Sequence, residues 1–537
     1  MQNRLFNVLF IVVIALVLAN CANRGTPTGG EKDITPPEIT KTIPENYSTH
    51  FTGDEIKIYF NEYVKLKNLS KQLIVSPPMN TAPEITPLGT ASKYITIKIY
   101  DTLQPNTTYA FNFGNSIVDN NEENPYTYYR YVFSTGDYID SLTVKGQVMD
   151  AIKFKADDFV SVLLYEADST YTDSLIYKKT PNYVTNTLDS TTNFTIENIK
   201  AGKYYLRALK DENSDNKFQQ RSDKIAFYKD IIEVSNDTTA FYELKLFSEQ
   251  LDYKAYKPRL VSGEKIVFGY QGDYKETKIE VLSDVPTDYT SRYYKDKETD
   301  SLNYFYLPKL EIDSLIFKIS NKTVIDTFTV NIKENKRDSL LIKPYPTGGI
   351  NFKEDFTLTG NIPFKTLNKE KITIIDKDSL SIPFTTVYDS LQNKYNISFD
   401  KTEENTYKIN LMPEALIDFF ENKNDTLNYS VRTQTEYSYG NARVILKNAV
   451  YPLIIQLTND KGEIKAEQYV TEPKPIDFEF IDPSKYYLRV IFDTNKNGIY
   501  DSGNYLKGIQ PERVSYYPEL IELRSGFDDI FTFTLLD

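Results

Sequence analysis

This 537-residue chain has one cysteine, Cys21, and one histidine, His50, so thiols and side chains that titrate near neutral pH are scarce. With one histidine, a Ser-His-Asp triad or a Cys-His pair would have to use His50, which lies in a polar stretch ahead of the first predicted strand, and a His-ligated zinc site needs partners that this sequence does not contain. Paired carboxylates of the kind that glycosidases use are compatible with the 75 acidic residues, although no pair stands out by its spacing. We therefore predict that the protein is not an enzyme, with a carboxylate-only glycosidase as the enzymatic alternative.

One Asp- and Asn-rich segment has the spacing of a calcium-binding loop. Asp493, Asn495, Asn497 and Asp501 stand at positions one, three, five and nine of such a loop, with a glycine at position six. Calcium takes about six to eight oxygen ligands, which this spacing would gather round one point. Position twelve is Asn504 rather than a bidentate Glu, so a turn whose side chains hydrogen-bond their own backbone is the alternative. Calcium is the only cofactor that the sequence suggests.

Cys21 follows an apolar stretch near the start of the chain. Residues 5–19 are apolar except for Asn7, and this is shorter than the roughly 17–25 apolar residues that span a bilayer, so it predicts a signal peptide. The run Leu18-Ala-Asn-Cys21 resembles a bacterial lipoprotein leader, which is cut before a cysteine that then receives a diacylglycerol. The resemblance implies lipidation at Cys21, and a plain secretory peptide is the alternative.

Composition predicts a globular β protein that does not bind nucleic acid. Hydrophobic residues make up 40% and charged residues 26% of the chain, which is typical of a globular protein. The net charge is −13, and the sequence has no run of basic residues that could bind a phosphate backbone. The 43 Tyr and 31 Phe residues favour half-buried strands. Apolar and polar residues alternate in segments such as 56–60 and 95–99, and no amphipathic helix exceeds about three turns. We predict an all-β chain of tandem β-sandwich domains.

The second half of the chain repeats the first. Lys203-Tyr-Tyr-Leu-Arg207 recurs as Lys485-Tyr-Tyr-Leu-Arg489 at an offset of 282 residues, and Asp211 pairs with Asp493 at the same offset. Repeats of this length predict a duplicated pair of domains. At a second offset of 298, Tyr109, Phe133 and Thr135 fall on Tyr407, Val431 and Thr433.

Two segments resemble known domain families. Residues 43–46, 56–64, 103–109 and 133–136 resemble the bacterial Ig-like domains of Bacteroidota envelope proteins. Residues from Ser141, including Val144-Lys-Gly-Gln-Val148 and Ala201-Gly-Lys-Tyr-Tyr-Leu206, resemble transthyretin-like or carboxypeptidase-regulatory sandwiches. With the leader, the chain resembles an Ig-like-domain lipoprotein of Flavobacterium-like bacteria. The predicted segments are a signal peptide (1–20), a flexible tether (21–36), an Ig-like domain (37–138), a transthyretin-like sandwich (139–248), a central sandwich (249–338), an Ig-like repeat (339–434) and a transthyretin-like repeat (435–537).

A tripeptide of Asp, then Ser or Thr, then a small or aliphatic residue recurs along the chain. In Bacteroidota this pattern marks O-glycosylation of exported proteins, so the resemblance implies a glycosylated surface. The alternative is that Asp-Ser opens a strand whose buried face begins at the aliphatic residue. The predicted acceptors are Ser141, Ser174, Ser301, Ser314, Ser339, Ser379, Ser390 and Thr426.

These observations predict a lipid-anchored scaffold or protein-interaction module of the cell envelope, and in its sharper form an accessory subunit of an outer-membrane assembly or transport complex. The alternative is a surface adhesin or glycan-binding lipoprotein, for which Tyr126–Tyr131 and Tyr516-Tyr517 are either sugar-stacking platforms or cross-strand pairs. Predicted partners are the membrane, other envelope proteins and, for the alternative, glycans. The predicted location is the outer membrane. Ala22-Asn-Arg-Gly25 has no acidic residue, which favours the periplasmic leaflet by analogy and leaves the leaflet open.

Overall fold

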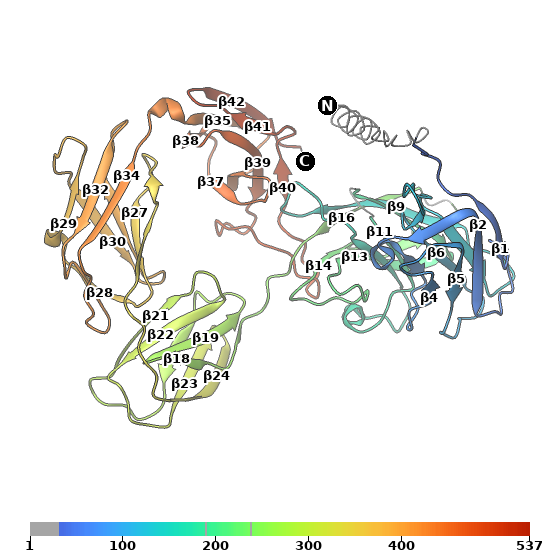
Figure 1. Cartoon of the computed structure of the whole chain (residues 1–537), viewed down its shortest axis with the longest axis horizontal. Coiled ribbons are helices and arrows are strands. Elements are labelled where there is room, and N and C mark those ends of the chain that lie inside the picture. Colours follow the sequence, from blue (N-terminus) through green and yellow to red (C-terminus); the bar gives the residue numbers. More distant parts are fainter. Residues whose placement is uncertain (1–31, 188–190, 237–238, 537) are drawn as a thin grey trace, which may run out of the picture. The chain divides into compact units, whose positions relative to one another are not determined.

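The computed structural model describes residues 32–187, 191–236 and 239–536, and these residues form an almost purely β structure (Figure 1). This confirms the predicted fold class. The predicted signal peptide, Cys21 and residues 22–31 of the tether lie outside the described residues. Within the described part, no helix is long and apolar enough to cross a membrane. Its helical segments are the short α2 (Leu69–Gln72), η1 (Asp173–Tyr177), η2 (Lys369–Lys371) and η3 (Glu436–Ser438).

The chain folds as two compact units. The first runs to Thr143 and includes Asn182–Leu188 and Ile196–Ala201, and the second contains the remaining residues to the C-terminus. Two strands, β11 (Tyr183–Asn186) and β12 (Asn193–Ile199), belong wholly or partly to the first unit by this division.

The first unit contains a sandwich of two sheets, ordered β1-β2-β5-β4, with β7 also paired to β2, and β3-β6-β8. Ile56, Ile58 and Phe60 on one sheet and Phe111 and Phe133 on the other are at most 4% exposed and form its core. Alternation of apolar and polar residues therefore turns one face of each strand inward. The strands are β1 (Ile39–Ile43), β2 (Glu55–Leu66), β3 (Ile74–Ser76), β4 (Glu84–Thr86), β5 (Ser92–Lys98), β6 (Thr108–Asn112), β7 (Ile117–Asp119) and β8 (Arg130–Ser134).

The second unit begins with strands that surround the first KYYLR repeat. The strand that carries this repeat, β13, pairs with β10, β14 and β15, and β16 pairs in parallel with β9. The bounds are β9 (Leu142–Asp150), β10 (Ser161–Glu166), β13 (Gly202–Lys210), β14 (Lys224–Phe227), β15 (Ile232–Val234) and β16 (Phe241–Leu246).

The central sandwich packs the sheet β17-β19-β22-β21, with β18 also paired to β19, against the sheet β20-β23-β24. Phe268, Tyr304 and Phe317 meet edge to face in its core, with ring centroids 5.2–5.4 Å apart. The strands are β17 (Lys254–Ala255), β18 (Arg259–Ser262), β19 (Lys265–Gln271), β20 (Lys278–Val281), β21 (Thr290–Lys295), β22 (Ser301–Leu307), β23 (Ser314–Asn321) and β24 (Val324–Asn331).

The next sandwich has the sheets β25-β27-β31-β30 and β26-β34-β32-β29, with the pair β28-β33 beside them. Its core includes Phe356, Ile397 and Tyr407. The strands are β25 (Ile342–Tyr345), β26 (Gly348–Gly349), β27 (Phe356–Gly360), β28 (Phe364–Leu367), β29 (Ile372–Ile375), β30 (Phe384–Asp389), β31 (Lys394–Phe399), β32 (Thr406–Leu411), β33 (Leu416–Asp418) and β34 (Leu427–Arg432).

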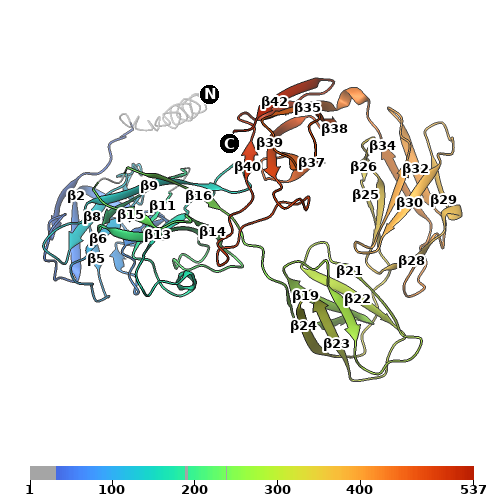
Figure 2. The ribbon, with the colours of Figure 1, turned by 180° about the vertical axis from the view of Figure 1, so that it is seen from behind.

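The last sandwich packs the sheet β37-β36-β39-β40, with β41 also paired to β39, against β38-β35-β42 (Figure 2). The second KYYLR repeat lies in β39, as the first lies in β13. The strands are β35 (Gly440–Lys447), β36 (Leu453–Thr458), β37 (Ile464–Val470), β38 (Ile476–Ile481), β39 (Ser484–Phe492), β40 (Val514–Tyr516), β41 (Ile521–Leu523) and β42 (Asp528–Thr534).

Hydrogen bonds recur at the offset of 298 residues. The Tyr109 hydroxyl accepts the Gln104 N–H at 2.9 Å, and the Tyr407 hydroxyl accepts the Thr402 N–H at 2.6 Å. The threonine hydroxyls of each copy also bond across the same turn, Thr135 to the Gln104 carbonyl and Thr433 to the Thr402 carbonyl. The repeated residues thus make the same local contacts in both copies.

Candidate functional site: the Asp493 loop and the Tyr505 contact

The Asp493 loop, residues 493–513, connects β39 to β40 at the edge of the last sandwich. Asp493 directly follows β39 and is only 2% exposed. Its carboxylate accepts the N–H groups of Asn497 at 3.1 Å and Gly498 at 2.8 Å, and Gly498 has a φ of 74°, which glycine adopts without strain. Burial alone would raise the pKa of Asp493, but these N–H groups outweigh it and hold the pKa below its usual value.

The structure brings the side chains of Asn495, Asn497 and Asp501 together, whereas the carboxylate of Asp493 bonds to the backbone of the same loop. The side-chain amides of Asn495 and Asn497 both donate to Asp501 Oδ2, at 2.5 and 2.7 Å. A calcium ion would take the amide oxygens instead of these N–H groups. In the described part of the chain, no three His, Cys, Asp or Glu side chains are grouped so as to hold a metal ion. The loop therefore consists of Asx turns, and calcium binding at this loop stays a prediction.

Glu512 closes the Asp493 loop from the far end. Its carboxylate, on a residue 8% exposed, accepts the N–H groups of Thr494 at 2.7 Å and Asp501 at 3.1 Å. The first copy has the same arrangement, because Asp223 accepts the N–H groups of Glu212 at 3.3 Å and Gln219 at 2.7 Å. Sequence reasoning assigned no role to either carboxylate, although Asp223 and Glu512 align in the two copies at an offset of 289 residues, which was the available signal.

Beyond Asp501 the loop inserts Tyr505 against the strands of the first KYYLR copy, within the second compact unit. Tyr505 is 2% exposed, and its hydroxyl accepts Arg207 Nε–H at 3.1 Å and donates to Asp173 Oδ1 at 3.2 Å. Its ring meets Phe227 edge to face at 5.5 Å, and its N–H donates to the Glu249 carboxylate at 2.5 Å. We call this arrangement the Tyr505 contact.

Arg489 makes the reciprocal connection. Arg489 holds the position in the second KYYLR copy that Arg207 holds in the first, and the two are 4% and 3% exposed. Arg489 Nη1–H donates to the carbonyl of Ile152 at 2.6 Å, and Phe154 stacks on Tyr487 with centroids 4.7 Å apart. The buried arginine of each copy therefore bonds to a residue of the other copy, Arg207 to a side-chain hydroxyl and Arg489 to a backbone carbonyl.

The electrostatics of the Tyr505 contact suit a structural role. Burial raises the pKa of Tyr505 to about 12, so its hydroxyl is neutral at physiological pH and both donates and accepts. Burial opposes the charge of Arg207, but the surrounding tyrosine hydroxyls and Asp173 outweigh it and raise the arginine pKa. These groups hydrogen-bond to one another and none of them is activated as a nucleophile. The arrangement can therefore hold the last sandwich against the strands of the first KYYLR copy.

The predicted glycosylation acceptors differ in accessibility. Ser301 is 6% exposed and its hydroxyl lies 2.9 Å from that of Thr299, while Ser314 is half-buried in β23. The remaining six are exposed, namely Ser141, Ser174, Ser339, Ser379, Ser390 and Thr426.

The predicted tyrosine clusters are mostly packed inward. Tyr129 and Tyr131 are 9% and 0% exposed, and Tyr126 packs edge to face on Tyr129 at 5.7 Å. Tyr516 donates its hydroxyl to the carbonyl of Ile152, and Tyr517 packs against Phe533 at 5.5 Å. These side chains pack within the sandwiches or, in the case of Tyr516, bond across the contact between the two repeats.

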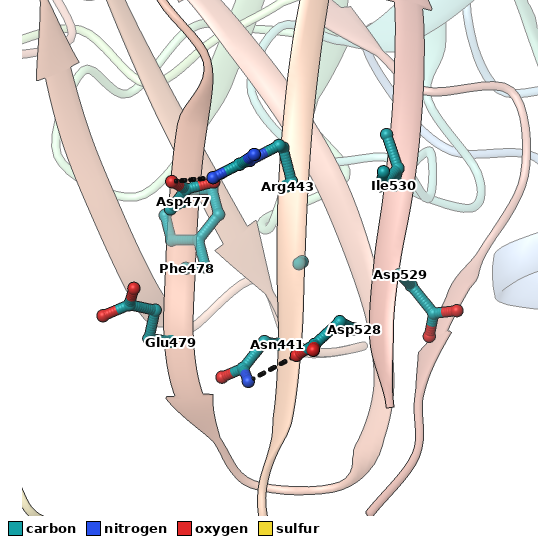
Figure 3. A pocket seen from close by; sticks show the side chains of 9 residues that line it. Asn441, Arg443, Asp477, Phe478, Glu479, Asp528, Asp529 and Ile530 are labelled. Carbon is teal, nitrogen blue, oxygen red and sulfur yellow. Dashed lines mark hydrogen bonds and ion pairs between the residues drawn. The ribbon is translucent and has the colours of Figure 1, made fainter. Parts of the chain in front are cut away.

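A pocket of about 310 Å³ lies on the face of β35, β38 and β42 (Figure 3). Its polar groups are paired across the strands, because Arg443 binds Asp477 through two bonds of 2.6 and 2.8 Å and Asn441 donates to Asp528 at 2.7 Å. Glu479 points away from these pairs (Figure 3). It forms an ion pair with Lys353 at 2.5 Å. These pairs stabilise the sheet face and present no converging catalytic groups.

Comparison with known proteins identifies the first sandwich. Residues 33–135 match the family model of the bacterial Ig-like domain, and no curated protein matches the chain. Similar solved structures include domains 1–6 of the surface layer protein SbsC, with 11% identity, a match that covers 91% of this chain and 68% of that one, and a TM-score of 0.17. The TIE protein of Bacillus anthracis has 10% identity, a match that covers 95% of this chain and 76% of that one, and a TM-score of 0.15. The BSP domain of a biofilm associated protein is another, with 8% identity, a match that covers 94% of this chain and 99% of that one, and a TM-score of 0.15. At these TM-scores the likenesses carry no argument about function or location.

Proposed function

We propose that this chain is a non-enzymatic, lipid-anchored scaffold of the bacterial cell envelope. Its sandwiches present surfaces to other envelope proteins, and its sharper role is that of an accessory subunit in an outer-membrane assembly or transport complex. Cys21 carries the lipid, and the outer membrane holds the anchor, with the periplasmic leaflet favoured by residues 22–25.

The observation that carries this proposal is the reciprocal contact between the two KYYLR copies. Buried Arg207 and Arg489 are each used to bind the other copy rather than to face a substrate cavity. A buried arginine is costly unless its donors are satisfied, so its use here favours a fixed spacing of the sandwiches. Fixed spacing is what a docking scaffold requires. The bacterial Ig-like match of the first sandwich supports the same class of protein.

The anchor is tested by labelling cells with a clickable fatty acid and comparing the parent with Cys21→Ser. The parent should carry the label and fractionate with the outer membrane, and the variant should lose both properties. A variant that keeps the label and the membrane association would overturn lipidation at Cys21. Protease treatment of whole cells then assigns the leaflet, because only a surface-facing chain is cleaved before the cells are opened.

The scaffold role is tested by cross-linking in intact cells followed by mass spectrometry. We expect outer-membrane or periplasmic proteins to be recovered with the chain. Recovery of polysaccharide alone would favour the adhesin or glycan-binding alternative, and recovery of no envelope protein would reject the scaffold. Hydrolysis of a polysaccharide by the purified chain would reject the non-enzymatic proposal.

A further inference from the structure

A row of tyrosines and lysines crosses one sheet of the first sandwich. Lys41 on β1 is the direct register partner of Tyr59 on β2, and Tyr59 is the direct partner of Tyr94 on β5. Lys41 Nζ lies 4.7 Å from the Tyr59 ring centroid, and the Tyr59 and Tyr94 centroids are 5.7 Å apart. Beside them, Lys93 Nζ lies 5.5 Å from the centroid of Tyr63. We call these five residues the Tyr-Lys row.

The Tyr-Lys row is open to solvent and contains two lysines and no acidic residue, although the whole chain has a net charge of −13. Tyr63 is 55% and Tyr94 46% exposed. Among the described residues, Lys41 and Lys93 have no carboxylate within the 4.0 Å of an ion pair, whereas the neighbouring Lys57 binds Glu55 at 2.8 Å. The row therefore offers two uncompensated ammonium groups among aromatic rings.

Several acidic groups lie near this end of the sheet, and two of them, Asp119 and Glu123, are bonded to other groups. Asp119 is 2% exposed and accepts the N–H groups of four successive residues, 121–124. Glu123 pairs with Lys67. Burial raises the pKa of Glu62, and the nearby charges of Asp119, Asp33 and Glu122 raise it further. These carboxylates reduce the positive potential without pairing with Lys41 or Lys93.

The chain enters the first sandwich at the same end as the Tyr-Lys row. Asn124 Nδ2–H donates to the carbonyl of Asp33 at 3.0 Å, and the N–H of Asn120 in the same loop donates to the carbonyl of Tyr63 at 2.9 Å. Only residues 22–32 separate Cys21 from this point. Fully extended, a segment of that length reaches at most about 40 Å, and as a flexible coil its ends lie roughly 20 Å apart. A lipid at Cys21 would thus keep the row close to the bilayer.

We propose that the Tyr-Lys row lies on the phospholipid headgroup layer of the membrane that holds the anchor. Tyrosine places an apolar ring and a polar hydroxyl at this depth, and lysine reaches anionic phosphates from a long apolar stem. Each lysine near an anionic surface strengthens binding roughly fivefold. The affinity of two lysines alone is weak, but a short tether makes the binding intramolecular at an effective concentration on the order of millimolar. The geometry rests on the proposed anchor, whereas the lipid chemistry of the row does not.

The test uses the mature chain, residues 21–537 with Cys21→Ser, and vesicles of phosphatidylglycerol and phosphatidylcholine in equal amounts. We expect weak binding, seen as a larger fraction of the chain floating with these vesicles at low salt than at high salt or with pure phosphatidylcholine. Lys41→Gln with Lys93→Gln should lower the partition coefficient about 25-fold, at roughly fivefold per lysine. The matched control replaces Lys333 and Lys343, two exposed lysines elsewhere, by Gln. Equal partition of the double variant and this control would overturn the proposal.

A second measurement uses the lipidated protein in nanodiscs that contain phosphatidylglycerol. Acetylation of Lys41 and Lys93 should be several times slower than that of Lys333 and Lys343, and this protection should vanish in phosphatidylcholine nanodiscs. Equal acetylation rates in both discs would contradict the proposal. If Cys21 is not lipidated, fatty-acid labelling is absent while vesicle binding of the lipid-free chain is unchanged. If the chain is not a scaffold, only the cross-linking experiment shows it.

Discussion

Removing the Tyr505 side chain should separate the two KYYLR copies. Tyr505 is 2% exposed, and its hydroxyl bonds with Arg207, Tyr171 and Asp173. Truncating a buried aromatic side chain costs about 3–5 kcal/mol. At about 1.4 kcal/mol per factor of ten, Tyr505→Ala should lower the docked-to-undocked ratio by roughly two to three and a half orders of magnitude. Tyr505→Phe keeps the ring but leaves Arg207 Nε–H unsatisfied, which costs about 1–3 kcal/mol.

The assay is a distance distribution between spin labels on the two copies. Lys203 and Lys485 open the two KYYLR repeats and are exposed, and Cys21→Ser removes the only native cysteine. Labels at Lys203→Cys and Lys485→Cys should give one narrow distribution in the parent and a broad one in Tyr505→Ala, with Tyr505→Phe in between. Tyr437→Ala, at a side chain that is 77% exposed, is the control and should keep the narrow distribution.

An unchanged narrow distribution in Tyr505→Ala would refute this reasoning. It would mean that the reciprocal half of the contact, where Arg489 binds the carbonyl of Ile152 and Phe154 stacks on Tyr487, holds the copies together without Tyr505. Circular dichroism must show intact β structure in every variant, so that broadening reports undocking and not unfolding.

Three further predictions concern single residues. Calcium should raise the melting temperature of the parent but not of Asp501→Ala, and identical melting with calcium and with chelator would leave only the Asx turns. Two lysine ammonium groups hold the pKa of Glu414 at about 2, so its contribution to stability is complete above about pH 4.5 and is lost as the pH falls through about 2. The urea midpoint of Glu414→Gln should lie below that of the parent at pH 7 and converge with it near pH 2, and a gap that widens on acidification would contradict this. Tyr109→Phe and Tyr407→Phe should each lower the stability of their own sandwich by about 1 kcal/mol in urea titrations, because each loses one accepted N–H, and unequal losses would argue against equivalent roles.

Much of the fold could be predicted because burial in a sandwich leaves a period of two in the sequence. Ile56, Ile58 and Phe60 lie inside β2, and Ile95 and Ile97 lie inside β5, all at most 4% exposed. The Asx turn at Asp493 could be predicted equally well, since its hydrogen-bonding side chains lie within nine residues of one another. Local patterns of this kind are encoded over short stretches of the chain.

The contact between the repeats could not be predicted from those patterns. Tyr505 bonds with Arg207 across 298 residues, and nothing local to either residue indicates the other. The recurrence of KYYLR showed that Arg207 and Arg489 hold the same position, but a repeat does not show that its copies face one another. Arginine is also rarely buried, so the sequence favoured solvent for both side chains.

The most direct test of the scaffold proposal compares partner capture in intact cells between the parent, Tyr505→Ala and the control Tyr437→Ala. If the docked repeats present the binding surfaces, cross-linking should recover the same envelope proteins with the parent and the control, and several times less of them with Tyr505→Ala at equal expression and equal fatty-acid labelling. Undiminished capture by Tyr505→Ala, in a chain that the spin labels show to be undocked, would contradict the central claim, as would the absence of any envelope protein from the parent sample.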